Sequence, residues 1–402
     1  MDVGFANLLG VAAVAFTVPF ILGFLPRVRV PAVVVELVAG IALGPAALGW
    51  IHPDEVVTVI ATLGVSFLLF LAGLELDLEQ LRGRPLKIGS VGFVLSVLIG
   101  LALTIPLGAA GVIIRPALVT IALASTSVGI VIPMLRDSGN LTSPVGMFTV
   151  AGASVAEVGT IALLAVFFST KGSPTVEALL LVLVAFLGLG VLWLLRWMQR
   201  HSDAMRVFVR LSDTSSQIRV RLAVLLLLAA VVVASEFGFE AILGAFLAGA
   251  VLAIAVSTWE NQEGFRSKVE AVGFGFFVPV FFINSGMNFD LSGLAEWEEL
   301  ARIPAFLLVM LAARGIPALL YRRDLSRRET VAAGLLQATN LSFIVVVADL
   351  GVRLDQMRPV TADALVVAGL LSVLLFPALA HRFLPKGSPE PEPLDAASDE
   401  AL

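Results

Sequence analysis

Long apolar runs separated by short polar segments fill most of the chain. A run of about 20 apolar residues forms a helix long enough to cross the ~30 Å hydrocarbon core of a bilayer. The backbone polar groups of a segment in lipid must be paired within that segment, so the runs predict an all-α polytopic membrane protein. They predict 13 transmembrane helices, at residues 5–25, 32–51, 56–75, 88–110, 114–135, 145–168, 175–198, 219–236, 240–256, 271–290, 301–321, 328–350 and 360–381.

The basic residues between the runs indicate an orientation. With the N-terminus outside and the C-terminus inside, 20 of the 26 Lys and Arg residues fall in inside loops and 5 in outside loops, while Arg314 lies within a span. An excess of Lys and Arg in cytoplasmic loops is the usual determinant of topology. We therefore expect the N-terminus outside and the C-terminus inside.

Two of the predicted spans contain polar clusters that interrupt the apolar pattern. Residues 125–127 (Ser-Thr-Ser) lie within the span 114–135, and residues 337–340 (Gln-Ala-Thr-Asn) lie within the span 328–350. Secondary transporters place broken helices at corresponding positions of two repeats. If the span 175–198 is a linker, the six spans before it and the six spans after it form two repeats. The two interrupted spans then occupy corresponding positions, and the second repeat has the opposite orientation in the membrane. The sequence thus predicts two inverted repeats with crossed broken helices.

Composition narrows the function classes. The chain is 58% hydrophobic and 14% charged, with a mean hydropathy of +0.99, which excludes a soluble globular protein. It has no cysteine, and its three histidines fall at predicted loop or helix-end positions, so we expect no thiol chemistry and no His-based metal site. We find no phosphate-binding loop and no nucleophile–His–acid set, so we expect no enzyme activity, no cofactor and no nucleic-acid partner. The acidic, proline-rich residues 386–402 should form a disordered tail.

One carboxylate, Glu157, lies in the middle of the small-residue segment 150–160. A carboxylate at the bilayer centre costs about 2.5–3.5 kcal/mol on insertion scales, so such residues default to a function. Burial favours the protonated form of a carboxylate, and a nearby cation opposes this. A monovalent cation can displace the proton if hydroxyl and carbonyl oxygens complete its shell. The candidates for that shell are Ser154, Thr126, Ser127 and Asn340.

Four segments, residues 30–49, 64–77, 243–252 and 278–288, resemble the signature segments of the cation/proton antiporter superfamily, in its Kef-type branch. The resemblance runs from about residue 25 to residue 380. It implies a sodium/proton-exchanger-like transmembrane domain over residues 1–385 that works as a homodimer. Spans within 5–75 and 219–290 would form the scaffold and dimer side, and spans within 88–168 and 301–381 would form a mobile core. Kef channels proper carry a cytoplasmic nucleotide-binding domain, which we do not expect here.

The match also shows a departure from the family's pattern. The carrier span of the family holds two adjacent acidic or amide-plus-acid residues, and the matching positions are Ala156 and Glu157. Glu157 keeps the ion-binding carboxylate, whereas the first side chain is lost. In many relatives that first residue pairs with a basic group in the eleventh span. The resemblance implies that Arg314 is the corresponding residue in this chain. We interpret Arg314 as a structural charge or ion-pair partner of Glu157, and Glu36 as a packing or gate residue near the cytoplasmic end of the second span.

The resemblance and Glu157 together predict a secondary antiporter in the cytoplasmic membrane of a prokaryote. It would exchange Na⁺ or K⁺ for H⁺ by an elevator-like movement, with one-for-one, electroneutral stoichiometry and no metal other than the transported cation. Two alternatives stay open: a channel-like K⁺ efflux pathway, and a degenerate carrier or sensor in which a Glu157–Arg314 pair is locked.

Overall fold

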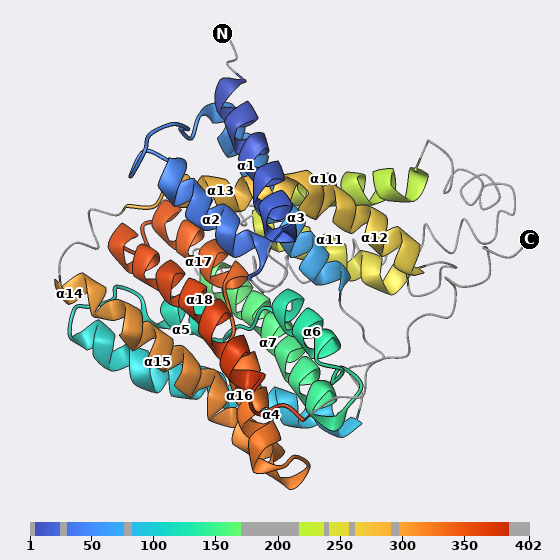
Figure 1. The fold of residues 1–402 in the computed structure, drawn as a ribbon, viewed down its shortest axis with the longest axis vertical. Helices are drawn as coiled ribbons and strands as arrows, with labels where there is room; N and C mark the ends of the chain where they lie inside the picture. The colour runs from blue at the N-terminus through green and yellow to red at the C-terminus, as the bar shows by residue number, and fades with distance from the viewer. Residues whose placement is uncertain are drawn as a thin grey trace, which may run out of the picture. The chain divides into compact units, whose positions relative to one another are not determined.

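The computed structural model describes residues 5–24, 30–75, 83–169, 217–236, 241–256, 262–290 and 297–385. The predicted span 175–198 and the tail 386–402 lie outside these residues. Every regular element of the described part is a helix, as Figure 1 shows. The elements are α1 (Ala6–Gly23), α2 (Ala32–Leu43), α3 (Glu55–Leu74), α4 (Gly83–Ala109), α5 (Pro116–Ala124), α6 (Val128–Asp137), α7 (Pro144–Ser169), α10 (Ile218–Glu236), α11 (Ala241–Val256), α12 (Gln262–Val272), the π-helix η1 (Gly273–Phe277), α13 (Val278–Met287), α14 (Trp297–Leu300), α15 (Arg302–Gly315), the 3₁₀-helix η3 (Pro317–Arg323), α16 (Arg327–Gln337), α17 (Ser342–Arg353) and α18 (Pro359–Ala380).

Ten helical segments of the described part are long and apolar enough to cross a membrane, and α2 and residues 244–254 are shorter apolar helices. The prediction of an all-α, membrane-spanning protein is therefore confirmed for the residues that the structure describes. The count of 13 spans stays a prediction, as do the orientation and the repeats.

Helix bounds differ from the predicted spans in two places. The predicted span 32–51 is helical only as far as Leu43, because Gly44 leaves the helical region and Pro45 follows it. Gly49 then adopts a positive φ of 64° in the loop that leads to α3. The predicted span 271–290 begins earlier, because α12 runs without a break into η1 and α13. A search for apolar runs misses α12 because Glu263, Arg266, Lys268 and Glu270 make this helix polar.

The chain divides into two compact units. Unit 1 comprises residues 1–79 and 160–297, and unit 2 comprises residues 80–159 and 298–402. Unit 1 contains α1, α2, α3 and α10 to α13. Unit 2 contains α4, α5, α6, most of α7, and α15 to α18. The boundary after Gly159 falls inside α7.

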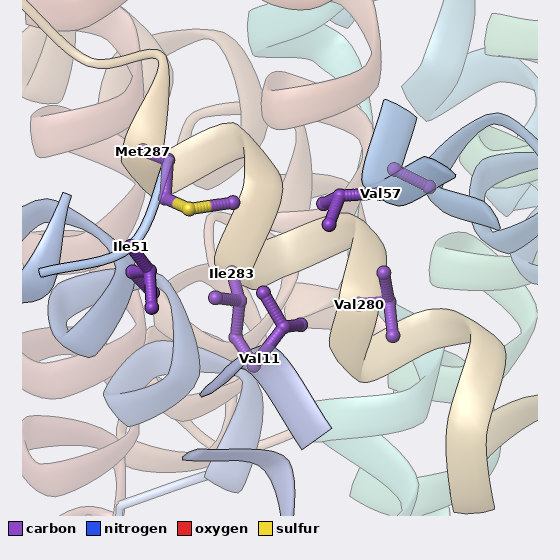
Figure 2. Packing of buried hydrophobic residues seen from close by; sticks show 7 residues of the cluster. Val11, Ile51, Val57, Val280, Ile283 and Met287 are labelled. Carbon is purple, nitrogen blue, oxygen red and sulfur yellow. The ribbon is translucent and has the colours of Figure 1, made fainter. Parts of the chain in front are cut away.

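Unit 1 is held together by an apolar cluster and by close helix contacts. Figure 2 shows Val11 of α1, Val57 of α3 and Ile283 of α13 packed in one cluster, which also includes Ile51, Ala61, Val280 and Met287. Glycines let the backbones approach. A Cβ added to Gly249 of α11 would overlap the carbonyl oxygen of Phe70 in α3. Small residues at such contacts are the usual device for packing helices in membranes.

Unit 2 packs its helices around buried small and aromatic side chains. One cluster joins Phe148 of α7 to Tyr321 of η3, whose rings lie 5.3 Å apart, and includes Val145, Ala318, Leu325 and Ala333. The first turn of α16 is fixed by a capping box, in which Ser326 Oγ accepts from the Glu329 N–H and the Glu329 carboxylate accepts from the Ser326 N–H. These contacts fix the start of α16 and pack it against α7 and η3.

Candidate ion-binding site at the helix breaks of unit 2

The helix breaks predicted from the polar clusters are both present. The first break separates α5, which ends at Ala124, from α6, which begins at Val128. The second separates α16, which ends at Gln337, from α17, which begins at Ser342. Ser, Thr and Asn side chains compete with the helix by bonding nearby backbone groups, and each cluster consists largely of such residues.

The two breaks meet, and each satisfies backbone groups of the other. The Ser127 N–H donates to the Thr339 carbonyl at 3.0 Å, and the Leu341 N–H donates to Ser127 Oγ at 3.1 Å. Asn340 Nδ2 donates to the Ala122 carbonyl at 2.8 Å. A helix end leaves backbone groups without intrahelical partners. Crossing two breaks supplies the missing partners without water, so non-helical backbone becomes tolerable inside an apolar unit.

Three of the predicted ion ligands are therefore brought together. Thr126, Ser127 and Asn340 are 0%, 3% and 0% exposed. Ser127 Oγ lies 3.3 Å from Asn340 Oδ1, and Thr126 Oγ1 donates to the Gln337 carbonyl at 2.6 Å. Ser372 of α18 completes the group, since its hydroxyl accepts from the Asn340 N–H at 3.1 Å. In this state the three side chains satisfy the helix breaks.

Arg314 of α15 reaches the same crossing. The side chain is 1% exposed. Its Nε donates to Thr126 Oγ1 at 3.0 Å and to the Gln337 carbonyl at 3.3 Å. Its Nη1 donates to Ser96 Oγ of α4 at 3.0 Å, and its Nη2 donates to the Gly152 carbonyl of α7 at 3.1 Å. The guanidinium thus ties α4, α7 and both breaks together. It also lies at the C-terminal end of α16, where a cation offsets the helix dipole.

α7 carries Glu157 and packs against the crossing. A Cβ added to Gly152 would overlap Gln337 Nε2 and Tyr321 Oη, so glycine is needed where α7 approaches the second break. Glu157 follows five residues later, about 7.5 Å along the helix axis at 1.5 Å per residue. Glu157 is 9% exposed and Ala156 is 0% exposed, while Ser154 is half-buried. A carboxylate and a set of buried hydroxyl and carbonyl oxygens therefore occupy one unit.

Glu36 belongs to α2 of unit 1, where it is 3% exposed. Within the described residues no group of three or more His, Cys, Asp or Glu side chains is arranged to hold a metal ion.

The sequence reasoning missed Ser96 as a partner of Arg314. A signal was present, because the buried residues of α4 are the small or hydroxyl-bearing Gly89, Gly92, Ser96, Gly100 and Thr104. Their spacing of three or four residues puts them on one helix face. Such a face marks a close helix contact, and its serine is the group most able to bond a buried cation.

Comparison with known proteins agrees with this architecture. The sequence profile described as "Sodium/hydrogen exchanger, transmembrane" matches residues 12–384. The chain is 28% identical to the "Na(+)/H(+)-K(+) antiporter GerN" of Bacillus cereus, over 88% of the chain and 90% of that protein. It is also 28% identical to the "Putative Na(+)/H(+) antiporter YjbQ" of Bacillus subtilis, over 96% of the chain, and it spans 64% of the length of that relative.

The fold is also similar to that of a solved structure, the sodium proton antiporter MjNhaP1 from Methanocaldococcus jannaschii. The TM-score is 0.63 at 16% identity, covering 94% of this chain and 97% of that one. At that identity the likeness speaks for the fold, while the profile match covers nearly the whole chain. The chain belongs to the transmembrane sodium/hydrogen exchanger family.

Proposed function

We propose that the protein is a secondary antiporter that exchanges a monovalent cation, Na⁺ or K⁺, for H⁺ across the cytoplasmic membrane of a prokaryote. Family membership supports cation/proton exchange as the class of activity. The names of bacterial relatives refer to Na⁺, and in one case also to K⁺. The observation that carries the proposal is the buried carboxylate of Glu157, on the helix that packs against the crossed breaks.

Glu157 is the group for which the proton and the cation compete. A buried carboxylate needs a compensating positive charge. A proton supplies it by forming the neutral acid, and a cation supplies it if neighbouring oxygens replace its hydration shell. Because one carboxylate takes either a proton or a monovalent cation, the two are exchanged one for one. No net charge then crosses the membrane in a cycle.

The oxygens that surround the cation come from α7 and from the crossing. Ser154 lies three residues before Glu157 on α7, so it occupies a neighbouring face. Thr126, Ser127 and Asn340 already bond backbone groups, so as ligands they would offer remaining lone pairs. Arg314 acts as a fixed charge whose hydrogen bonds hold the breaks in place, and it stays protonated in any accessible state.

The division into two units supports a proposal of alternating access. We propose that unit 2 is the mobile core and that unit 1 is the scaffold, through which two copies of the chain form a homodimer. In this arrangement the chain has 13 spans in two inverted repeats, with its N-terminus outside and its C-terminus inside. The core carries the ion by an elevator-like movement, as expected when the ion site lies within one rigid unit. Glu36 then acts as a packing or gate residue of the scaffold.

Proteoliposomes that contain a pH-sensitive dye test this function. Adding NaCl or KCl outside should raise the internal pH, whereas choline chloride should have no effect. A potential-sensitive dye should report no charge movement during this exchange. Cation flux that ignores the pH gradient and generates a potential would favour a channel-like pathway instead. A protein that moves neither cation nor proton would favour the locked Glu157–Arg314 carrier.

A further inference from the structure

Two helices of unit 1 that pack together, α2 and α13, each carry a buried side-chain oxygen atom that has no hydrogen-bond partner among the described residues. One is Oε2 of Glu36 in α2, and the other is Oδ1 of Asn284 in α13. The two residues are 3% and 2% exposed. Leaving a buried acceptor unsatisfied costs about 1–3 kcal/mol, and more for a charged group. Two such acceptors on helices that pack together make this contact a candidate binding site.

The contact between α2 and α13 brings these residues into the same region. A Cβ added to Gly40 would overlap the carbonyl oxygen of Ile283, and one added to Gly286 would overlap that of Leu37. Further along both helices, a Cβ added to Gly44 would lie 2.9 Å from Met287 Cα. From the Gly40–Ile283 contact to the Gly44–Met287 contact the residue numbers of both helices rise, so the two helices run parallel.

The parallel packing also fixes the direction in which Glu36 and Asn284 project. Glu36 precedes Gly40 by one turn, and Asn284 directly follows Ile283. At about 100° per residue, both side chains leave the same flank of the contact, with their Cα atoms roughly two residues, or about 3 Å, apart along the axes. The unsatisfied oxygens of a carboxylate and an amide thus share one side of a glycine-mediated helix contact.

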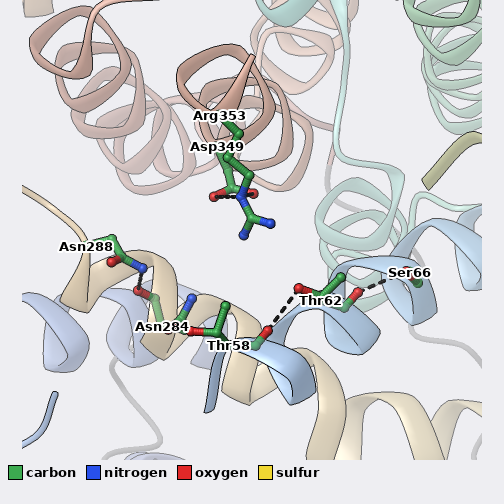
Figure 3. A network of polar contacts seen from close by, with 7 residues as sticks. All are labelled: Thr58, Thr62, Ser66, Asn284, Asn288, Asp349 and Arg353. Atoms are coloured by element: carbon green, nitrogen blue, oxygen red, sulfur yellow. Dashed lines mark hydrogen bonds and ion pairs between the residues drawn. The ribbon is translucent and has the colours of Figure 1, made fainter. Parts of the chain in front are cut away.

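Other polar side chains on α13 and on the neighbouring α3 donate to backbone carbonyls of their own helices. Figure 3 shows that Asn288 Nδ2 donates to the backbone carbonyl of Asn284, at 2.9 Å, and so leaves the Asn284 side-chain oxygen unpaired. The figure also shows the hydroxyls of Thr62 and Ser66 on α3, which packs along α13, donating to carbonyls of their own helix. Their protons are used, so their oxygens offer only lone pairs. The lone pairs of a carboxylate and of an amide oxygen suit a cation.

We propose that Glu36 and Asn284 form a second monovalent-cation site, located in unit 1 and separate from Glu157. Hard oxygen ligands of this kind suit alkali cations. A single carboxylate matches one positive charge, so the site takes a monovalent rather than a divalent ion. The identity of the ion class rests on the proposed function, but occupancy of the site does not depend on turnover. A cation held in unit 1 would bind at a position that the moving core does not carry.

Thermal unfolding of the purified protein in detergent tests this site separately from transport. Melting temperatures are measured against NaCl or KCl, with choline chloride replacing them at constant ionic strength. A ligand that binds only the folded state raises the melting temperature with its concentration. The key variant is Glu157→Gln, because it removes the carboxylate of the transport site. We expect this variant to keep a saturable, cation-dependent rise in melting temperature.

Adding Glu36→Gln to the Glu157→Gln protein should weaken that rise, with an apparent Kd increased at least ~10-fold, as expected for loss of the charged ligand. Asn284→Ala in the same background should also weaken it, and provides a second variant if Glu36→Gln does not fold. Asn288→Ala is the matched control and should leave the rise unchanged, because Asn288 bonds only a backbone carbonyl here.

Three results would overturn the site: no cation-dependent rise in Glu157→Gln, an undiminished rise when Glu36→Gln is added, or an equal rise with choline. If the melting temperature of the Glu157→Gln protein does not rise with cation concentration but depends strongly on pH, Glu36 holds a proton and no cation. Persistence of exchange in Glu157→Gln proteoliposomes would instead contradict the proposed function and leave the Glu36 site standing.

Discussion

Replacing Arg314 by methionine removes the side chain that joins α4, α7 and both helix breaks. Methionine keeps much of the volume, so the change isolates the guanidinium. Each of the three side-chain nitrogens donates a hydrogen bond, to Thr126, Ser96 and Gly152, and Nε shares its hydrogen with the Gln337 carbonyl. At about 1.5–3 kcal/mol for each bond to a charged group, their gross contribution is about 4.5–9 kcal/mol. Part of this is offset because methionine no longer requires a charge to be desolvated.

We therefore expect Arg314→Met to lower the free energy of unfolding by about 3–5 kcal/mol, the range found when one partner of a buried charged network is removed. The melting temperature in detergent should fall by on the order of 10 °C. The melting temperature of Arg314→Lys should lie between those of the parent protein and Arg314→Met. An ammonium keeps the charge but lacks the planar guanidinium that reaches several acceptors.

Arg353→Met is the matched control in the same unit. Arg353 forms an ion pair with Asp349 four residues earlier, at 3.1 Å, and its side chain is 44% exposed; Figure 3 shows this pair. Surface ion pairs of this kind contribute about 0–1 kcal/mol, so the control should melt close to the parent protein. Arg314→Met and Arg353→Met proteins with the same melting temperature would refute the assignment of Arg314 as the tie between the breaks.

Two further changes test the packing and the capping described above. Gly249→Ala should destabilise the protein by about 1–3 kcal/mol, because its Cβ would meet the Phe70 carbonyl, whereas Gly275→Ala, with nothing within 4 Å of the added Cβ, should be close to neutral; equal melting temperatures for the two variants would contradict the close contact. Ser326→Ala should cost about 0.5–2 kcal/mol by removing the N-cap of α16, and Ser326→Thr, which keeps the hydroxyl, should recover most of the loss in the same thermal assay.

The elements that the sequence predicted well are those set by local pattern. Apolar runs determine that the chain is helical, and polar clusters determine where two of its helices break. The clusters 125–127 and 337–340 could be recognised in the sequence because hydroxyl and amide side chains stand out in an apolar run. Lipid offers them no hydrogen-bond partner, whereas the backbone groups of a helix break do. The end of α2 was missed because a glycine and a proline stop the helix while the apolar composition continues to residue 51.

The partners of Arg314 lay beyond sequence reasoning for a different reason. Ser96 is 218 residues away from Arg314, and the carbonyl groups of Gly152 and Gln337 have no side-chain signature at all. Long-range bonds to backbone atoms depend on how the helices pack. The roles of Glu157, Ser154 and Glu36 remain predictions. The structure gives the burial of these side chains, and burial alone does not identify the ion that they bind.

A substitution at Ala156 tests the proposed one-for-one stoichiometry of exchange. Its side chain is fully buried and adjacent in sequence to Glu157, at the position where the resemblance described above implies an acidic or amide residue. If one carboxylate accounts for one-for-one exchange, then adding a second one by Ala156→Asp should allow charge movement to appear with the potential-sensitive dye, provided the variant folds and transports.

The most direct measurement is cation-driven proton movement in proteoliposomes that contain Glu157→Gln, compared with the parent protein and with Glu157→Asp. Glutamine keeps the shape of the side chain but binds neither a proton nor a compensating cation, so it should abolish the change in internal pH on addition of Na⁺ or K⁺. Aspartate keeps the carboxylate and should retain exchange. Normal exchange by Glu157→Gln would contradict the assignment of Glu157 as the ion-carrying group.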